Sequence, residues 1–160
     1  MFNRRILFVV AAVAALAGCA TRSNPVSVAD TIAATPQLSM LNSLLTKAGL
    51  TDTLKGTGPF TVFAPTNEAF AKVPAKTMGE LAKDPAKLKA VLTYHLIPGK
   101  VMAVDVKNGN SKTVNGASVA LSKAGDFVII EEAMVQTADI SATNGVVHII
   151  DSVPIPPAKH

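Results

Sequence analysis

Residues 60–70 read FTVFAPTNEAF, a short apolar run that gives way to a turn and then to helix-forming residues. The apolar run at 60–63 predicts a buried strand, and Pro65 is expected to end it. Thr66 or Asn67 then caps the helix that follows, because either side chain can accept a hydrogen bond from the first helical turn. We interpret this strand-to-helix junction as structural rather than as a ligand-binding loop.

The segment before this stretch is predicted to be helical. Apolar residues recur there at three- and four-residue spacing, which places them on one face of a helix. These residues are Leu38, Leu41, Leu44, Leu45 and Ala48. Thr35 and Pro36 supply a cap and a first-turn proline, and Gly49 is expected to end the helix.

Two further helix signals follow the central stretch. Residues 77–80 have the spacing of a capping box, which predicts that a helical turn starts there. Asp84 and Pro85 predict a second start, because Asp is a good cap and Pro is favoured at the first helical position. One face of this helix carries Leu88, Val91, Leu92 and His95. The Pro-Gly pair at 98–99 is expected to end it.

From Lys100 onward the pattern changes to the two-residue period of strands. Asn115-Gly116 predicts a type I′ hairpin turn. Asn144-Gly145 precedes the last apolar run, and there too we expect a turn with positive φ. The expected strands cover residues 101–106, 113–114, 117–121, 127–130 and 146–150. Helices first and short antiparallel strands later predict the α+β class.

Length and charge favour a single domain that does not bind nucleic acid. The chain has 160 residues, and domains cluster at about 100–150 residues. It has 15 Lys and Arg against 11 Asp and Glu, and 13 basic residues remain without Arg4 and Arg5 of a predicted signal sequence. So small an excess is not the basic footprint of a nucleic-acid binder. With no Trp and one Tyr, the chain also lacks the aromatic platforms on which bases stack.

The N-terminus predicts an exported lipoprotein. Arg4 and Arg5 precede an unbroken apolar run at residues 6–18, which fits a signal peptide and is shorter than the ~20 residues that a membrane span needs. The run leads into Leu-Ala-Gly-Cys at 16–19, which resembles the motif read by the lipoprotein signal peptidase. Cys19 is the only Cys of the chain, and lipidation would explain an unpaired thiol in an exported protein.

This cleavage site sets the predicted organisation of the chain. The segments are a signal peptide at 1–18, a lipidated tether at 19–26, the folded domain at 27–157 and a tail at 158–160. Ala20, rather than Asp, after the cysteine implies the outer membrane if the organism is Gram-negative. The alternative is ordinary cleavage after Ala17 or Ala20, which would leave a soluble periplasmic or secreted domain.

Three stretches of the predicted domain resemble one family. Residues 60–70 resemble the first signature of fasciclin (FAS1) domains, and residues 144–151 resemble the second. Residues 92–99, which include Tyr94 and His95, resemble the Tyr-His segment between them. The order and the spacing of the three stretches also agree with the family. The resemblance implies a wedge of antiparallel β-sheets with helices packed on one side.

The same resemblance implies a non-enzymatic adhesion or interaction module on the cell envelope, with no cofactor and no metal. Its expected partner is an envelope or extracellular protein or a polysaccharide, and its expected link to the membrane is the lipid on Cys19. The sequence lacks the motifs of nucleophile-elbow hydrolases, zinc proteases and phosphate-binding loops. Two alternatives remain open, a periplasmic binder of a small apolar ligand or polysaccharide, and a hydrolase that uses His95 or His148.

Four residues in the resembling stretches are expected to be structural. His95 lies on the apolar face of its helix and His148 on an apolar strand face, so each is predicted to be buried and hydrogen-bonded to the backbone. Asn144 and Gly145 are predicted to serve the geometry of a turn rather than chemistry.

The candidate interaction residues are Asp139, Ile140 and Tyr94. The Asp139-Ile140 pair matches in position the Asp-Ile pair that integrin-binding fasciclin domains use, although Ala138 stands where that motif has Pro. We expect the pair in a connection just before the last strand. We expect Tyr94 at the boundary of its helix with its hydroxyl near water, because it is rotated by about 100° from an inward-pointing His95. The open alternative is that Asp139 caps a local turn and Ile140 belongs to the core.

Overall fold

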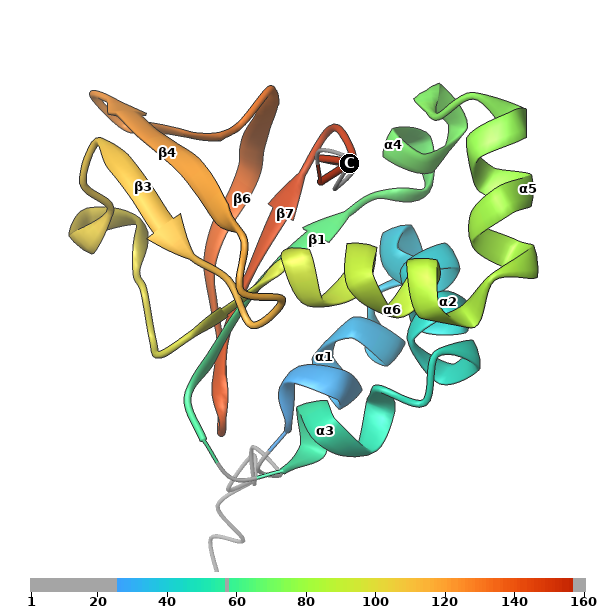
Figure 1. Cartoon of the computed structure of the whole chain (residues 1–160). Coiled ribbons are helices and arrows are strands. Elements are labelled where there is room, and N and C mark those ends of the chain that lie inside the picture. The colour runs from blue at the N-terminus through green and yellow to red at the C-terminus, as the bar shows by residue number, and fades with distance from the viewer. Residues whose placement is uncertain (1–25, 57, 157–160) are drawn as a thin grey trace, which may run out of the picture.

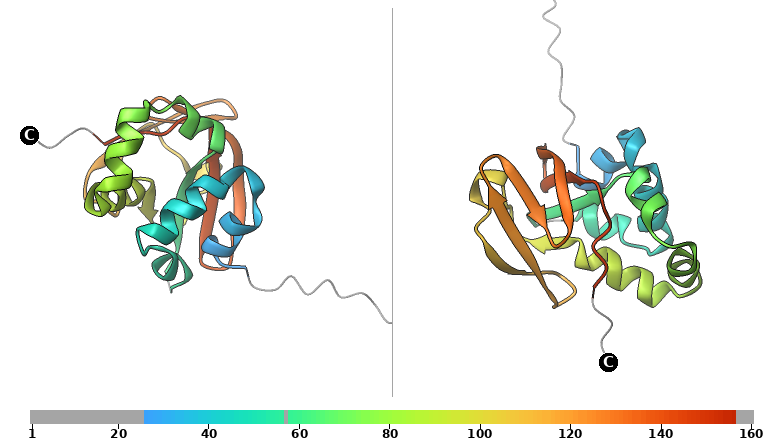
Figure 2. Two further views of the ribbon diagram at one scale, coloured as in Figure 1. Left: turned by 90° about the vertical axis from the view of Figure 1, so that its right-hand side faces the viewer. Right: turned by 90° about the horizontal axis from the view of Figure 1, so that it is seen from above.

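A computed structural model describes residues 26–56 and 58–156, in which a layer of helices covers one side of a curved β-sheet (Figure 1). The predicted signal peptide, Cys19 and the predicted tail lie outside the described residues. Figure 2 shows the same arrangement from the side and from above, with the helices gathered on one side and the strands of the second half of the chain on the other.

The first half of the chain supplies nearly all of the helices. They are α1 (Val28–Ala34), the short 3-10 helix η1 (Pro36–Leu38), α2 (Ser39–Lys47), α3 (Thr51–Lys55), α4 (Asn67–Lys72), α5 (Ala75–Lys83) and α6 (Pro85–Tyr94). Two of the predicted caps are present. Thr66 accepts a hydrogen bond from the Ala69 N–H at the start of α4, and Asp84 accepts from the N–H groups of Ala86 and Lys87 at the start of α6.

The described part of the chain forms seven strands in one continuous sheet. They are β1 (Phe60–Pro65), β2 (Leu96–Pro98), β3 (Gly109–Lys112), β4 (Ser118–Ala124), β5 (Phe127–Ile130), β6 (Ala133–Ala142) and β7 (Gly145–Ile150). Their order across the sheet is β2-β1-β7-β6-β5-β4-β3, and every neighbouring pair is antiparallel except β1 and β7. The predicted α+β class is therefore confirmed, with one parallel pair, β1 and β7, that the sequence did not indicate.

Strands β1 and β7 separate two hydrophobic cores. Every residue of β7 and all but the first of β1 are buried. On one face, Val62 and Val147 pack with the buried residues of α1, α2, α3 and α6. On the other face, Phe63 and Ile150 pack inside the curve of the sheet with residues of β4 and β5. Because both faces of these strands are covered, their sequences are continuous apolar runs without two-residue alternation.

The first predicted helix starts differently from expectation. The 3-10 turn η1 precedes α2, and Thr35 does not cap it, because its hydroxyl donates to the carbonyl oxygen of Thr31 at 2.8 Å. All three leucines of α2 are buried, as the spacing predicted. Gly49 follows the helix with φ of 69°, a left-handed conformation that favours glycine.

Two later helices also differ at one end. α5 begins at Ala75, two residues before the predicted start at Thr77, with Pro74 at the N-cap position. α6 ends at Tyr94, earlier than predicted, because residues 96–98 leave the helix to pair with β1 as the edge strand β2. The pairing with β1 therefore overrides the local signal for a longer helix.

Two strand predictions in the second half, at residues 101–106 and 113–114, are wrong, and the strand β6 was not predicted. Residues 101–106 hold the short 3-10 helix η2 (Ala103–Asp105), and the Val101 N–H donates to the side-chain hydroxyl oxygen of Thr61 at 2.8 Å rather than to a backbone carbonyl of a neighbouring strand. β6, the longest strand, lies where no strand was predicted. Its side chains show no regular alternation of burial, because two register shifts between Val135 and Ile140 turn them relative to the pleat.

The hairpin between β3 and β4 forms with a different turn from the predicted type I′. A type I′ turn needs positive φ at both central residues, whereas only Gly116 of the Asn115-Gly116 pair has positive φ, at 88°. The Gly116 N–H donates to the Thr113 carbonyl oxygen at 2.9 Å. This is a three-residue loop with glycine in the left-handed position, the next commonest hairpin connection.

Gly145 is required by a close approach of two strands rather than by a turn. It is the first residue of β7 and pairs with Phe60 in the parallel ladder. Its φ is not positive, contrary to our expectation. A Cβ atom at this position would lie 1.9 Å from the carbonyl oxygen of Phe60, so no side chain fits while β1 and β7 keep their distance.

We predict that Gly145→Ala lowers the free energy of unfolding by about 3 kcal/mol, because the new methyl group must push β1 away from β7. Gly79→Ala is the matched control. Gly79 lies inside α5 with nothing within 4 Å of an added Cβ, so the same change should stabilise the domain by about 0.5–1 kcal/mol. Urea unfolding of the two variants measures both effects, and equal stabilities would contradict the close-approach argument.

Candidate interaction surface

Asn144 joins the start of β7 to two helices. Its side-chain oxygen accepts from the Val28 N–H at 2.8 Å, at the first residue of α1. Its side-chain nitrogen donates to the carbonyl oxygens of Leu54 and Gly56 at the end of α3, the second at 2.9 Å. Helix ends leave such backbone groups without intrahelical partners, so Asn144 satisfies three of them at once. Its amide is fully engaged within the domain.

His95 is buried at the C-terminal end of α6, with 2 % of its surface exposed. Its Nδ1 donates to the Val91 carbonyl oxygen at 2.6 Å, and its Nε2 has no hydrogen-bond partner among the described residues. Burial lowers the pKa of His95 to about 4, against a smaller opposing effect of the bond to Val91. The imidazole is therefore neutral at neutral pH.

His148 is buried in β7 and holds together three segments. Its ring stacks on Phe63 of β1, with ring centroids 5.4 Å apart. Nε2 donates to the Val101 carbonyl oxygen at 2.8 Å, and Nδ1 accepts from the Asp139 N–H at 3.1 Å, which assigns the neutral ring with its proton on Nε2. Burial lowers the pKa of His148, partly offset by the bond to Val101 and by the Asp139 carboxylate.

Asp139 and Ile140 lie within β6, and not in a connection before β7 as expected. Asp139 has φ of 58°, and its carboxylate accepts from the Ala103 N–H at 2.7 Å. It therefore fixes the segment at η2, 36 residues away in sequence, rather than capping a local turn. Ile140 is half-buried and packs against the core on the helix side. Binding of a partner by this pair stays a prediction.

Tyr94 lies in the core inside the sheet, so the expectation that it stands at the boundary of its helix is wrong. It is 1 % exposed. Its hydroxyl donates to Glu131 Oε1 at 3.1 Å, with the Ser118 carbonyl oxygen at 3.3 Å as a second acceptor. Burial, helped by the Glu131 charge and hydrogen bond, raises the pKa of Tyr94 to about 12. Tyr94 shares no hydrogen-bond partner with Asp139, so the structure does not join the two predicted halves of the interaction site.

A cleft of about 520 Å³ opens over the hydroxyl end of Tyr94. Its walls are the β5–β6 turn with Glu131 and Glu132, Ser118 at the start of β4, and residues 152–155 after β7. Both glutamates are exposed. Glu131 has φ of 54°, and its Oε1 also accepts from the Ala120 N–H at 2.8 Å, which fixes the direction of its carboxylate.

A second cleft, of about 540 Å³, lies where α4 begins. Its polar lining includes Gln37, Gln136 and Asn67. The Asn67 amide already donates to Pro36 and Ser39 and accepts from the Met40 N–H at 2.9 Å. Asn67 therefore ties α4 to α2, which agrees with a structural interpretation of residues 65–68.

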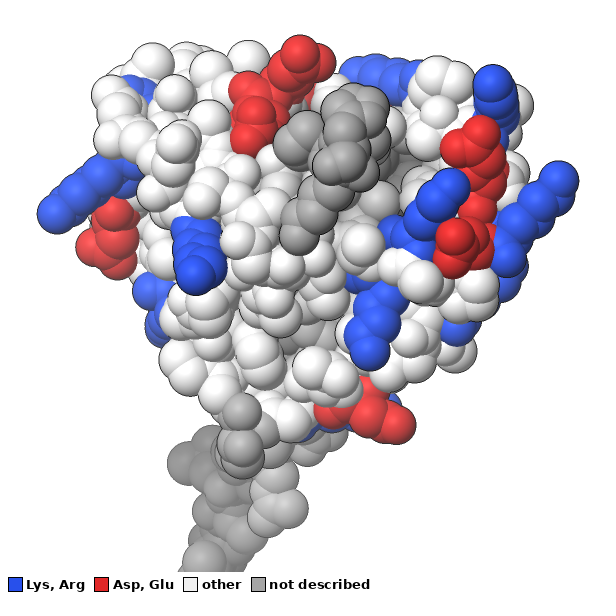
Figure 3. Space-filling model, viewed as in Figure 1, with Lys and Arg blue, Asp and Glu red and all other residues white. Residues whose placement is uncertain are grey.

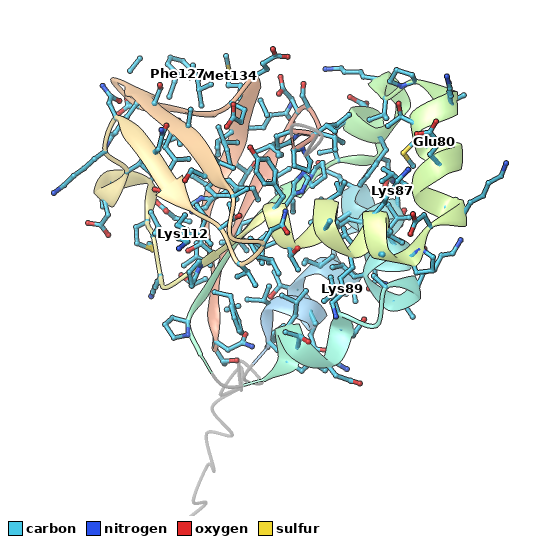
Figure 4. All side chains as sticks on the ribbon, viewed as in Figure 1. Glu80, Lys87, Lys89, Lys112, Phe127 and Met134 are labelled. Atoms are coloured by element: carbon cyan, nitrogen blue, oxygen red, sulfur yellow. The ribbon has the colours of Figure 1, made fainter. Side chains whose placement is uncertain are left out.

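Apolar side chains stand exposed on the outside of β5 and β6. Phe127 is 61 % exposed and Met134 is 43 % exposed. Ile129 pairs with Met134 across the two strands and lies two residues from Phe127, so the three side chains share one face of the sheet. We call these three residues the outer apolar face. Figure 4 shows Phe127 and Met134 at the same end of the domain, on its outside.

A family model described as the fasciclin domain matches residues 36–156. The chain belongs to the fasciclin domain family. It is 37 % identical over 140 residues to "Protein sll1483" of Synechocystis, a match that covers 86 % of this chain and 78 % of that protein. It is 39 % identical over 128 residues to "Immunogenic protein MPB70" of Mycobacterium bovis, covering 77 % of this chain and 65 % of the relative.

A third relative is the "Cell surface glycolipoprotein MPB83" of Mycobacterium bovis, 38 % identical over 129 residues, with 78 % of this chain and 58 % of the relative covered. The chain thus spans less than two thirds of these two mycobacterial proteins. Among solved structures, the fold is similar to the FAS1 domain pair of the insect cell adhesion molecule Fasciclin I. The TM-score is 0.62 at 20 % identity, over 80 % of this chain and 50 % of that one.

Both histidines that the structure describes, His95 and His148, are buried and hydrogen-bonded to the backbone. His95 and His148 are each 2 % exposed, and both are held by backbone groups rather than facing an open cleft. Residues 26–56 and 58–156 contain no group of three or more His, Cys, Asp or Glu side chains that could hold a metal ion. The hydrolase alternative therefore finds no support in the described geometry.

Sequence reasoning missed the surface residues of this fasciclin domain. Glu131 and Glu132 form the two-residue turn between β5 and β6, but the pair contains none of the Gly, Asn or Asp residues that signal such a hairpin. Without that signal the sequence does not indicate β6, and without β6 neither the turn nor the outer apolar face can be placed.

We predict that acid destabilises the domain through His95. The folded pKa of about 4 lies below the ordinary value of 6.5, so the unfolded chain binds more protons between these two pH values. The stabilisation is therefore complete above pH 6.5, and up to about 3 kcal/mol is lost as the pH falls to 4. His95→Gln should flatten this dependence in urea unfolding. Should the variant not fold, an NMR titration of His95 in the unmodified chain decides, and an ordinary pKa would contradict us.

We predict that Asp139→Ala lowers the free energy of unfolding by about 1–2 kcal/mol, whereas Asp139→Asn changes it by less than about 0.5 kcal/mol. Asn keeps an acceptor for the Ala103 N–H and tolerates positive φ, and Ala does neither. Thermal unfolding of the pair measures the contact. If Ala and Asn are equally tolerated, the bond between Asp139 and Ala103 contributes nothing to stability.

Proposed function

We propose that this chain is a lipid-anchored, non-enzymatic module displayed on the cell envelope for contact with envelope or extracellular components. The observation that carries the proposal is the position of Val26 relative to the outer apolar face. The Val26 carbonyl oxygen accepts from the Thr143 N–H at 2.9 Å, just past the end of β6, whereas Met134 lies at its start. Because β6 carries extra residues at its two register shifts, its length follows its regular partner β7. Met134 lies opposite Asp151 and Ala142 lies opposite Gly145, six residue steps of β7 apart, roughly 20 Å at about 3.3 Å per residue.

An anchor at Cys19 would hold the domain by the end at which α1 begins. In Figure 1 this end lies at the bottom, and β6 rises from it to the far end of the sheet. The exposed apolar residues and the Tyr94 cleft would then be directed away from the membrane. An interaction module needs its contact surface directed away from the membrane, whereas a face buried in the membrane would be directed toward it.

Two further observations support the proposal. A mycobacterial relative is named a cell surface glycolipoprotein. From that name we propose lipid-linked display at the cell surface for this chain as well. None of the helices described between residues 26 and 156 is long and apolar enough to cross a membrane. In this proposal the motif at residues 16–19 is the site of lipid attachment.

The alternative of a small apolar ligand receives less support. Both described clefts have polar groups in their walls, the glutamates over Tyr94 in one and the amides of Gln37 and Gln136 in the other. A pocket for an apolar ligand is lined mainly by apolar side chains. A polysaccharide remains the second candidate, because the amide-lined cleft offers hydrogen bonds of the kind that sugar hydroxyls make.

We predict that Cys19→Ser moves the protein from the membrane fraction to the aqueous fraction of its cells. Several acyl chains hold a protein firmly, since each buried CH₂ contributes about 0.8 kcal/mol and a single chain binds only marginally. Intact-mass spectrometry of the unmodified protein should show the acyl mass, and an antibody to the domain should label intact cells. Mature protein without an acyl mass, or an epitope reached only after lysis, would overturn the proposal.

A further inference from the structure

We propose that the outer apolar face of Phe127, Ile129 and Met134 is a docking site for a protein partner whose own contact surface is apolar at its centre and basic at its edge. This inference rests on the proposed function, because an interaction module must present a contact surface. The inference adds which surface that is and which chemistry its partner has.

Phe127 and Met134 of the outer apolar face are exposed and Ile129 between them is half-buried, although their strands close the second core. Val128, Ile130 and Ala133 point inward and are buried, so the intervening residues of the same strands must point outward. The neighbouring strand β4 adds no charge to this face, because Ser122 pairs with Ile129 and Ala124 pairs with Phe127. Single exposed apolar side chains are ordinary, whereas contiguous ones with a charged rim are typical of interaction sites.

The rim of this face is acidic. Asp126 directly precedes Phe127, and Glu131 and Glu132 form the turn between β5 and β6. The Asp151 carboxylate accepts from the Met134 N–H at 2.9 Å, which places it at the fourth side. We call these four carboxylates the acidic rim. Figure 3 shows acidic side chains gathered at the top of the view, over the end at which β6 begins.

Lysines of the helical layer do not cancel this rim. Figure 4 shows Lys87 and Lys89 on α6, on the side of the domain away from Phe127. Lys72 reaches the rim, where its amine donates to the Asp151 carbonyl oxygen at 3.1 Å. Lys123 of β4 pairs with the inward-pointing Val128, and its amine donates to the Val104 carbonyl oxygen at 3.3 Å, away from the outer apolar face. One amine against four carboxylates leaves the rim negative, so a partner with Lys or Arg at its edge would be attracted and a partner with acidic residues repelled.

The cleft over Tyr94 gives the rim a place for one long cationic side chain. Glu131 is fixed by its bonds to Tyr94 and Ala120, and it stands at the same turn that borders the outer apolar face. Val153 and Ile155 line the opposite wall. The aliphatic stem of a Lys or Arg can lie against such a wall while its charged head reaches the carboxylate.

The observations favour a protein partner over a membrane and over a second copy. An anionic lipid surface would be repelled by the acidic rim, and the face lies at the end of β6 away from Val26. A two-fold dimer through this face would place the four carboxylates of one rim against those of the other, which like-charge repulsion opposes.

Three synthetic helical peptides of equal length test this chemistry with the mature Cys19→Ser chain. The first carries a Leu face with Lys at its edges, the second has Glu in place of each Lys, and the third keeps Lys but has Ser in place of each Leu. Lys159→Gln and His160→Gln are included so that the cations of the chain's own last residues do not compete. NMR titration with amide labels should show binding of the first peptide alone, with shifts in β5 and β6.

Variants then separate the two parts of the surface. Phe127→Ser with Met134→Ser should weaken binding of the basic apolar peptide by about tenfold or more. Glu131→Gln with Glu132→Gln should weaken it several-fold and remove most of its salt dependence, because Gln keeps the hydrogen bonds but not the charge. The matched control is Val104→Ser with Asp105→Asn on η2, where Val104 is 74 % exposed beside an exposed acid, and it should bind as the unmodified chain does.

Four results would each overturn the inference: equal binding of the acidic peptide, equal loss in the η2 control, no peptide binding at millimolar concentration, or binding to vesicles of anionic lipid through Phe127. Self-association that Phe127→Ser abolishes, seen by sedimentation, would assign the face to a second copy instead. Because these assays use the non-lipidated chain, a negative result in them does not contradict the proposed lipid anchor. A missing acyl mass, in turn, does not change the outcome of these assays.

Discussion

The parallel contact between β1 and β7 is the constraint on which the rest of the domain depends. These strands come from opposite ends of the chain, and they approach closely because position 145 has no side chain above the Phe60 carbonyl. Their pairing brings the helical first half against the sheet of the second half. It also creates two faces that both need covering, which is why the domain has two cores rather than one.

Buried polar residues of the family motifs connect β1 and β7 to the segments around them. Asn144 connects the start of β7 to the ends of α1 and α3, and His148 connects its middle to Phe63, Val101 and Asp139. Thr61 does the same for β1, donating to the Gly99 carbonyl and accepting from Val101. Buried polar groups of this kind are costly unless they are paired, so each contact also specifies where a loop must lie. The signature residues thus encode architecture, and the neutral buried histidines belong to it.

The surface available for contact is built from other residues. Phe127, Met134 and the glutamates of the β5–β6 turn lie outside the stretches that mark the family, on strands whose inner residues close the second core. Scaffold and surface therefore occupy alternate positions of the same strands. This arrangement lets the outer residues differ between relatives without disturbing the fold, because alternate side chains of a strand point to opposite faces.

The sequence by itself determined the α+β class, the family, a helix cap at Thr66 or Asn67, the cap at Asp84, and the burial of His95 and His148, because these depend on local spacing, capping chemistry and apolar faces. Only the tertiary structure decided that Tyr94 is buried, because the core that receives it forms when the sheet curves around the end of α6, and helical rotation alone does not reveal a second core. The same holds for position 145, which must be glycine because of a strand 85 residues earlier in the chain. It also holds for Asp139, whose hydrogen-bond partner is 36 residues away. Contacts between distant segments leave no period in the sequence, so β6 and the surface it completes appear only once the sheet is assembled.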